Sequence, residues 1–370
     1  FQGCSNLTAL DVSKWVTNNV TSFSYTFSTL SNITALDLTN WSFENATTIA
    51  GMFSFDGSLT NLKLPRNMSK NKIRKMSSVF QSCTSLASLD LSTLDTSLVD
   101  EMQMTFFECN NLATIKGISN FKMSRVTTIF GLFQSCVKLT ELNLSSWNVS
   151  SLRDMGSFAY GCTNLKTLNI TGWKTNKLVT IYSAFQSCRY LTELDVSGLD
   201  VSDTETINSV FSDCTSLLSL DLSKWNVSNV TSFDGLCQNC SSLTSINVSG
   251  WNTTNAKTMT YMFANCSMLQ SLNLSSWDII SADTVSESLT YFFNRCDLLT
   301  TFDPPKNINA SITLPNNLTM ASVKKVINNL VNRSTTTSAT LKVGANNMSS
   351  LEKDTDTLNI AVNKNWSVVS

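Results

Sequence analysis

The feature that most constrains this chain is a repeat of 26 or 27 residues that is marked by cysteines. In two repeats, between Cys4 and Cys83, this position holds Leu30 and Asp56 instead of a cysteine. No single repeat of this length can bury its apolar face, so such a period is typical of solenoids, whose stacked turns share one continuous core. The cysteines in this position are Cys4, Cys83, Cys109, Cys136, Cys162, Cys188, Cys214, Cys240, Cys266 and, after a longer step, Cys296.

Each repeat contains two apolar patterns. After the cysteine comes L-x-x-L-x-L, as at Leu217, Leu220 and Leu222, whose alternation places the last two leucines on one face of a short strand. Before the cysteine, apolar residues recur at the spacing of one face of a short helix, as at Val126, Ile129 and Phe133. The sequence therefore predicts a leucine-rich-repeat-like α/β solenoid of about twelve strand–turn–short-helix units.

The repeat also carries a family resemblance. The unit from Phe211 to Phe233 reads F-x-x-C-x-x-L-x-x-L-D-L-S-x-W-N-V-S-N-V-T-S-F and resembles the BspA-like class of leucine-rich repeats. That class occurs in surface proteins and lipoproteins of bacteria, in some protist surface proteins and in phage-associated proteins. The resemblance implies surface exposure, adhesion and protein–protein contact, and it implies no catalytic residue. Residues 57–76 and 115–126 depart from the pattern, and we expect those two units to bulge.

Two domains are predicted. Residues 1–303 form the solenoid, and Phe1 already stands in register as the end of a helix, so we expect the N-terminal cap to be missing. Residues 304–370 form an α/β capping module. Its predicted elements are a helix over 318–333 with Thr319 as N-cap, a strand over 338–343, a helix over 348–365 and a strand over 366–369.

Composition excludes several functions. The formal net charge is −1, so attraction to nucleic acid or to an anionic membrane has no electrostatic basis, and no apolar run is long enough to span a membrane. The chain has no histidine, which removes the commonest general base and metal ligand, so we expect no catalytic residue, no metal and no cofactor. The eleven cysteines follow the repeat and are expected to be buried thiols, and this includes the C-x-x-C pair Cys237 and Cys240.

The residues between and beside the strand leucines share one face of the predicted solenoid. They are mostly Ser, Thr and Asn, with a few acidic residues. Same-sign charge gathers there at Glu141, Glu193, Asp195 and Asp221, which we take as the candidate binding residues for a basic or amide-rich partner. The alternative is a solvated face whose residues are merely tolerated by the parallel ladder.

About twenty N-x-S/T sequons occur along the chain. Candidate glycosylation sites are Asn6, Asn19, Asn226, Asn252 and Asn317. Because the repeat consensus is itself rich in Asn, Ser and Thr, the sequons can also be incidental.

The sequence thus predicts a non-catalytic, extracellular adhesion or protein–protein interaction module on a cell surface. Its partner would be a protein or a cell-envelope ligand, with no nucleic acid and no direct membrane insertion. The alternative is a structural or receptor-binding component of a phage tail appendage, located on the virion, or of an extracellular filament with self-association in a larger assembly.

Overall fold

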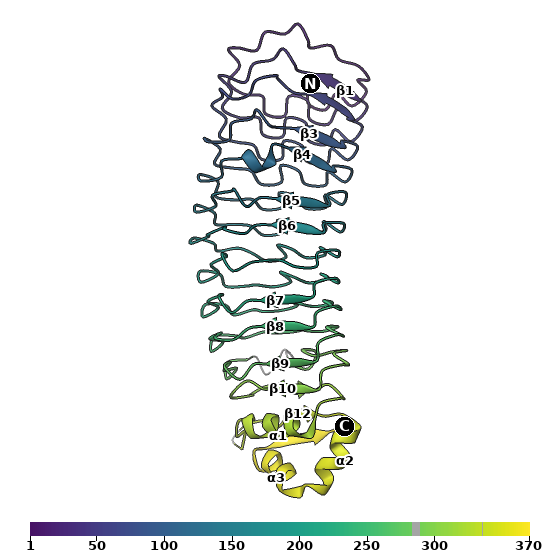
Figure 1. Ribbon diagram of the computed structural model, residues 1–370, viewed down its shortest axis with the longest axis vertical. Coiled ribbons are helices and arrows are strands. Elements are labelled where there is room, and N and C mark those ends of the chain that lie inside the picture. Colours follow the sequence, from purple (N-terminus) through teal and green to yellow (C-terminus); the bar gives the residue numbers. More distant parts are fainter. Residues whose placement is uncertain (283–288, 335) are drawn as a thin grey trace. The chain divides into compact units, whose positions relative to one another are not determined.

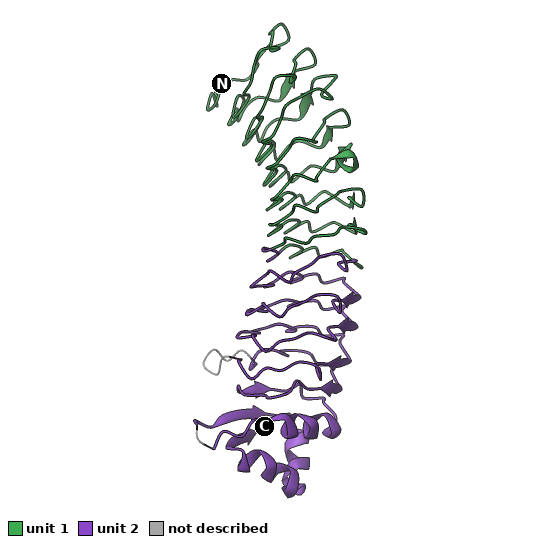
Figure 2. Ribbon diagram, turned by 90° about the vertical axis from the view of Figure 1, so that its left-hand side faces the viewer, with its two compact units in different colours: residues 1–178, 184–194 green, residues 179–183, 195–370 purple. Residues whose placement is uncertain are grey.

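The computed structural model describes residues 1–282, 289–334 and 336–370 (Figure 1). The chain divides into two compact units, which Figure 2 shows in different colours. Unit 1 contains residues 1–178 and 184–194, and unit 2 contains residues 179–183 and 195–370. The predicted domain boundary after residue 303 stays a prediction.

Unit 1 is a stack of solenoid turns, each contributing one short strand at most. The central residue of each strand points inward and its two neighbours point outward, which is the alternation that the L-x-L pattern predicted. The strands pair in parallel and in register as β1–β2, β3–β4 and β5–β6. They are β1 (Ala35–Asp37), β2 (Asn61–Lys63), β3 (Ser88–Asp90), β4 (Thr114–Lys116), β5 (Glu141–Asn143) and β6 (Thr167–Asn169).

Unit 2 continues the same kind of turn and then changes architecture. Its repeat strands pair in parallel as β7–β8 and β9–β10. They are β7 (Ser219–Asp221), β8 (Ser245–Asn247), β9 (Ser271–Asn273) and β10 (Thr301–Asp303). The predicted solenoid fold with turns of about 26 residues is therefore confirmed.

The segments before the cysteines are not the short helices that the spacing predicted. In the second turn, Tyr25 and Thr29 have φ angles of 55° and 63°, in the left-handed region that a helix cannot pass through. The chain instead makes successive tight turns. The N–H groups at alternate positions bond to the next turn of the solenoid, as Phe27 does to the Met52 carbonyl at 2.9 Å. Bonds between turns thus replace the bonds within a helix.

Stacked aromatic columns fill the core. In unit 1, the rings of Phe27, Phe53 and Phe80 stack with centroids 5.8 and 5.5 Å apart. Buried tryptophans add hydrogen bonds between turns. The indole N–H of Trp147 donates to the Ile118 carbonyl at 2.9 Å, and that of Trp173 donates to the Leu144 carbonyl at 2.8 Å. A buried tryptophan is therefore satisfied by the backbone of the preceding turn.

The cysteine column is structural. All eleven thiols are free, and all except Cys4 are buried, so the prediction of buried thiols is confirmed for ten of them. The Cys109 thiol donates to the Phe80 carbonyl and the Cys136 thiol to the Phe106 carbonyl, each at 3.0 Å. Burial raises the pKa of Cys109 and Cys162 to about 12, which keeps these groups protonated and unreactive.

We predict that one thiol of the eleven, that of Cys4, reacts rapidly with a disulfide reagent in the native protein at pH 8, because the others are buried. The measurement is thiol titration with and without 6 M guanidinium chloride. A Cys4→Ser variant should lose the fast phase altogether. Rapid labelling of two or more thiols without unfolding would contradict this placement of the cysteine column.

The C-terminal part of unit 2 packs three helices and a three-stranded parallel sheet, in the order β11–β12–β13. Thr319 caps the first helix as predicted, since its side chain accepts the Ser322 N–H. The single helix predicted over 348–365 is wrong, because two helices meet at Asp354, which caps the second through the Thr357 N–H. The elements are β11 (Ile312–Thr313), α1 (Met320–Asn329), β12 (Ala339–Lys342), α2 (Ala345–Lys353), α3 (Thr355–Asn363) and β13 (Trp366–Val369). No helix among the described residues is both long and apolar enough to cross a membrane.

Candidate binding grooves on the strand face

Most strands end in Asp or Asn, and this residue closes the turn that follows. The Asp90 carboxylate accepts the Ser92 N–H at 3.0 Å, and the Asp221 carboxylate accepts the Ser223 N–H at 2.9 Å. These are Asx turns, in which a short polar side chain bonds the backbone two residues on. The Asp and Asn side chains at the strand ends thus have a structural role in these turns. The sequence analysis did not predict this role.

Two strands of unit 1 end in lysine instead. Lys63 and Lys116 cannot accept a hydrogen bond, and each reaches back to the aspartate of the preceding turn, Asp37 at 3.0 Å and Asp90 at 2.8 Å. Hydrogen bonds from Thr39 and from Lys63 lower the pKa of Asp37 to about 2. Hydrogen bonds from Lys116 and from Ser92 do the same for Asp90. Each lysine therefore neutralises an acid of its neighbour and leaves its own turn without the Asx bond.

The same two repeats are one residue longer than most. The steps from Asp56 to Cys83 and from Cys109 to Cys136 are 27 residues. After β4, the additional residue is accommodated by Gly117, with a φ of 86°, and by a short 3₁₀ turn, η1 (Ile118–Asn120). A Cβ on Gly117 would lie 2.4 Å from the Ser92 Cα, so glycine is required here.

Strand pairing lapses directly after each of these strands. β2 does not pair with β3, and β4 does not pair with β5. On another side of the turns, a second ladder of parallel bridges runs unbroken from Ser22 to Asp154, so the turns stay stacked across both lapses. In unit 2, β8 and β9 are also unpaired but their backbones remain in contact, whereas β4 and β5 show no comparable contact. Pairing also stops after β6, where the described residues of the next turn of unit 1 form no strand. The lapses after β2 and β4 leave the second ladder intact, so they are openings of the strand face alone.

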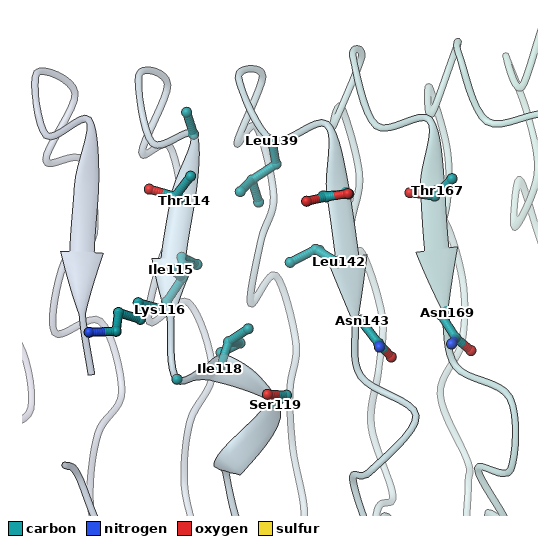
Figure 3. Close-up of a pocket in the computed structure, with 13 residues that line it drawn as sticks. Thr114, Ile115, Lys116, Ile118, Ser119, Leu139, Leu142, Asn143, Thr167 and Asn169 are labelled. Atoms are coloured by element: carbon teal, nitrogen blue, oxygen red, sulfur yellow. The ribbon is translucent and has the colours of Figure 1, made fainter. Parts of the chain in front are cut away.

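The opening between β4 and β5 is a groove of about 540 Å³ (Figure 3). Its floor consists of Ile115, Ile118, Leu139 and Leu142, and Figure 3 shows Leu142 pointing from β5 toward β4. Its walls are polar, with Thr114, Glu141, Asn143, Thr167 and Asn169 among the lining residues. We call this hollow the β4–β5 groove.

A smaller groove of about 250 Å³ lies beside β2, at the other long repeat. Leu62, Leu64 and Pro65 line it together with Lys63 and Arg66. The bulges expected at residues 57–76 and 115–126 thus coincide with the two grooves. A signal in the sequence could have placed them more sharply, namely a 27-residue step combined with a lysine in the Asp/Asn position.

The four candidate binding residues lie in different places. Glu141 is exposed, lines the β4–β5 groove and makes no hydrogen bond or ion pair with another described residue. Glu193 is exposed in unit 1, two turns further on. Asp195 and Asp221 are exposed in unit 2 and accept the Ser197 and Ser223 N–H groups, so they also close turns. The four residues remain a prediction as a joint binding site.

The candidate glycosylation sites are all exposed. Asn226 and Asn252 accept the N–H groups of Ser228 and Thr254, which is the same Asx turn as on the strand face. The Asn317 amide donates to the Asp297 carbonyl at 2.6 Å. The Asx turns give Asn226 and Asn252 a structural role that does not require a glycan, and glycosylation itself stays a prediction.

Within the described residues, no group of three or more Cys, Asp or Glu side chains is placed to hold a metal ion. What the arrangement offers chemically is binding, through an apolar floor with a polar rim.

The fold and the grooves define a leucine-rich-repeat-like solenoid, a fold that commonly binds proteins. The family model that matches the chain is DUF285, described as a Mycoplasma protein of unknown function, over residues 1–72, 74–193 and 179–302. The chain belongs to this family. No curated protein matches it.

Several solved structures are similar to the chain at low identity. A leucine-rich repeat protein from Bacteroides ovatus is 14% identical, with 85% of this chain and 80% of that chain covered and a TM-score of 0.38. A leucine-rich-repeat protein from Leptospira interrogans is 12% identical, with 94% of each chain covered and a TM-score of 0.24. A plant peptide hormone receptor is 15% identical, with 86% and 57% covered and a TM-score of 0.24.

Proposed function

We propose that this chain is a non-catalytic binding module that recognises a protein partner through the strand face of its solenoid, at the surface of a cell. The observation that carries the proposal is the β4–β5 groove, an opening with an apolar floor on a face whose outward positions are mostly polar. Binding sites commonly combine such a floor with a few placed polar groups.

Two further points support the proposal. Elsewhere in each turn, most of the apolar surface lies in the core columns and much of the backbone bonds to neighbouring turns, which favours the strand face as the place where a partner binds. The resemblance of the repeat to BspA-like surface proteins favours the extracellular side.

The test measures binding of the intact chain to isolated cell envelopes, with and without prior protease digestion of the envelopes. We expect saturable binding that protease abolishes and that weakens with salt. A variant with Glu141→Gln, Glu193→Gln, Asp195→Asn and Asp221→Asn removes four charges and keeps the Asx bonds. We expect it to bind roughly tenfold more weakly, since contacts of this kind are worth about 0.2–1 kcal/mol each.

A matched control neutralises four exposed acids outside the strand face. It carries Glu44→Gln, Asp203→Asn, Glu205→Gln and Glu352→Gln, and it should bind like the wild type. Equal losses in both variants would show that only net charge matters. Binding that survives digestion of the envelopes would exclude a protein partner.

A further inference from the structure

The β4–β5 groove lies between two strand edges that have no partner. β4 pairs only with β3 and β5 only with β6, so the facing edges of β4 and β5 remain open among the described residues. An open strand edge is a template on which another extended segment can pair. Here two such edges border one groove.

The direction of the backbone groups follows from the bonds on the far edges. In a parallel ladder, alternate residues direct their N–H and C=O to alternate neighbours. The Lys116 carbonyl accepts the Leu91 N–H in the preceding turn, so the N–H and C=O of Ile115 face the groove. The Thr140 carbonyl accepts the Lys166 N–H in the following turn, so the backbone groups of Glu141 and Asn143 face the groove from the other side.

The N–H groups of Ile115, Glu141 and Asn143 make no backbone hydrogen bond with another described residue. The groove volume of about 540 Å³ and its apolar floor suit a short segment that buries one side chain and exposes the next. A strand of three residues, the length of β4, is about 10 Å long. The residue that points inward would rest on Ile118 and Leu142.

The charges at the rim of the groove indicate which outward-pointing residues a bound segment should have. Glu141 has no partner for its carboxylate, whereas Lys116 is already paired with Asp90 at 2.8 Å. The net unpaired charge at the rim is therefore negative. A segment that runs parallel to β4 meets Glu141 with its first residue, the floor with its second and Asn143 with its third.

We propose that the β4–β5 groove binds an extended segment of a partner protein, which inserts between β4 and β5 as an additional strand. The segment has a basic residue, an apolar residue and a small polar residue in succession. The proposal rests on the protein-binding function proposed above and specifies its site and its mode of recognition.

The probe is a displayed library of random seven-residue peptides, selected against the intact chain. We expect enriched peptides that contain Lys or Arg next to Val, Ile or Leu. A synthetic copy of one selected peptide should bind at least tenfold more tightly than the same peptide with alternate backbone nitrogens methylated. Methylation removes the N–H donors and keeps the side chains, so a merely apolar site would not distinguish the two.

The chain offers a variant that closes the groove. Deletion of Gly117 together with Lys116→Asp restores the 26-residue step and the Asx position of the neighbouring repeats. It should bind the peptide at least tenfold more weakly and melt at the same or a higher temperature. Glu141→Lys, which keeps the loop as it is, should reverse the charge preference in a repeated selection. The matched control is Glu193→Lys, on the same face and away from the groove, which should change neither result.

The outcomes separate the two proposals. Unchanged peptide affinity in the closed variant, or an unchanged preference with Glu141→Lys, overturns strand insertion in this groove. A selection that enriches no peptide overturns it as well. If the chain nevertheless binds digestible envelope protein, the proposed function stands and its site lies elsewhere on the strand face.

Discussion

Replacing Asp56 by cysteine is expected to raise the free energy of unfolding at pH 8 by on the order of 3 kcal/mol. Asp56 occupies the cysteine position of its repeat and is completely buried. One carboxylate oxygen accepts the Leu30 N–H at 2.7 Å, and the other has no hydrogen-bond partner. Burial raises the pKa of Asp56 from 3.8 to about 7.

The direction of the pH effect follows from this raised pKa. Between pH 4 and 7 the folded chain holds a proton on Asp56 that the unfolded chain has lost, so stability falls as the pH rises through this window. Above pH 7 the full loss is on the order of 4 kcal/mol, at about 1.36 kcal/mol for each unit of pKa. The variant removes this loss, offset by about 1 kcal/mol because the Leu30 N–H loses its acceptor.

The measurement is urea unfolding of the wild type and the variant at pH 5.5 and pH 8. The variant should be more stable by about 3 kcal/mol at pH 8 and by only about 1 kcal/mol at pH 5.5, where roughly half of the pH-dependent loss has developed. Cys109→Asp is the converse control, since it places a carboxylate at the same position of a repeat two steps further on. It should lower stability at pH 8 by a similar amount. If the free energies of unfolding of the wild type and of Asp56→Cys differed by the same amount at both pH values, this would contradict the burial of a carboxylate that titrates in this range.

The period of the sequence was sufficient to predict the solenoid, because only stacked turns can bury apolar columns that recur every 26 residues. The same reasoning misassigned the segments before the cysteines. Residues such as Phe23, Phe27 and Leu30 are buried at a helical spacing, and two consecutive tight turns give the same spacing. What decides between them is the left-handed conformation of Tyr25 and Thr29, which lets alternate N–H groups bond to the next turn. A tyrosine or a threonine in a sequence does not predict a left-handed conformation.

The candidate site was predictable in part. The acids on the strand face were recognisable as exposed, and Glu141 does line the β4–β5 groove. The structural use of Asp221 was missed, although an Asp followed by Ser two residues later is a known turn signal. The groove itself depends on a single additional residue in the repeat, whose effect on strand pairing is a matter of three-dimensional register.

Replacing Leu220 by aspartate is expected to lower the free energy of unfolding by about 4 kcal/mol or more. Leu220 is the inward residue of β7 and is 3% exposed. Removing a buried leucine side chain alone costs about 2–5 kcal/mol. A carboxylate in its place must also be desolvated without a partner, which adds to the cost. The effect should be measured by urea unfolding at pH 7. At this pH the introduced carboxyl group is charged when it is exposed in the unfolded chain.

The adjacent position supplies the control, because β7 turns successive side chains to opposite faces. Asp221 is exposed, so Asp221→Asn, which keeps the bond from the Ser223 N–H, should cost less than about 0.5 kcal/mol. Asp221→Ala loses that bond and should cost about 1 kcal/mol. We therefore expect the loss in the free energy of unfolding to be by far the largest for Leu220→Asp, smaller for Asp221→Ala and smallest for Asp221→Asn. A larger loss at position 221 than at 220 would mean that β7 presents the opposite face to the core, and the strand face proposed for binding would then be wrong.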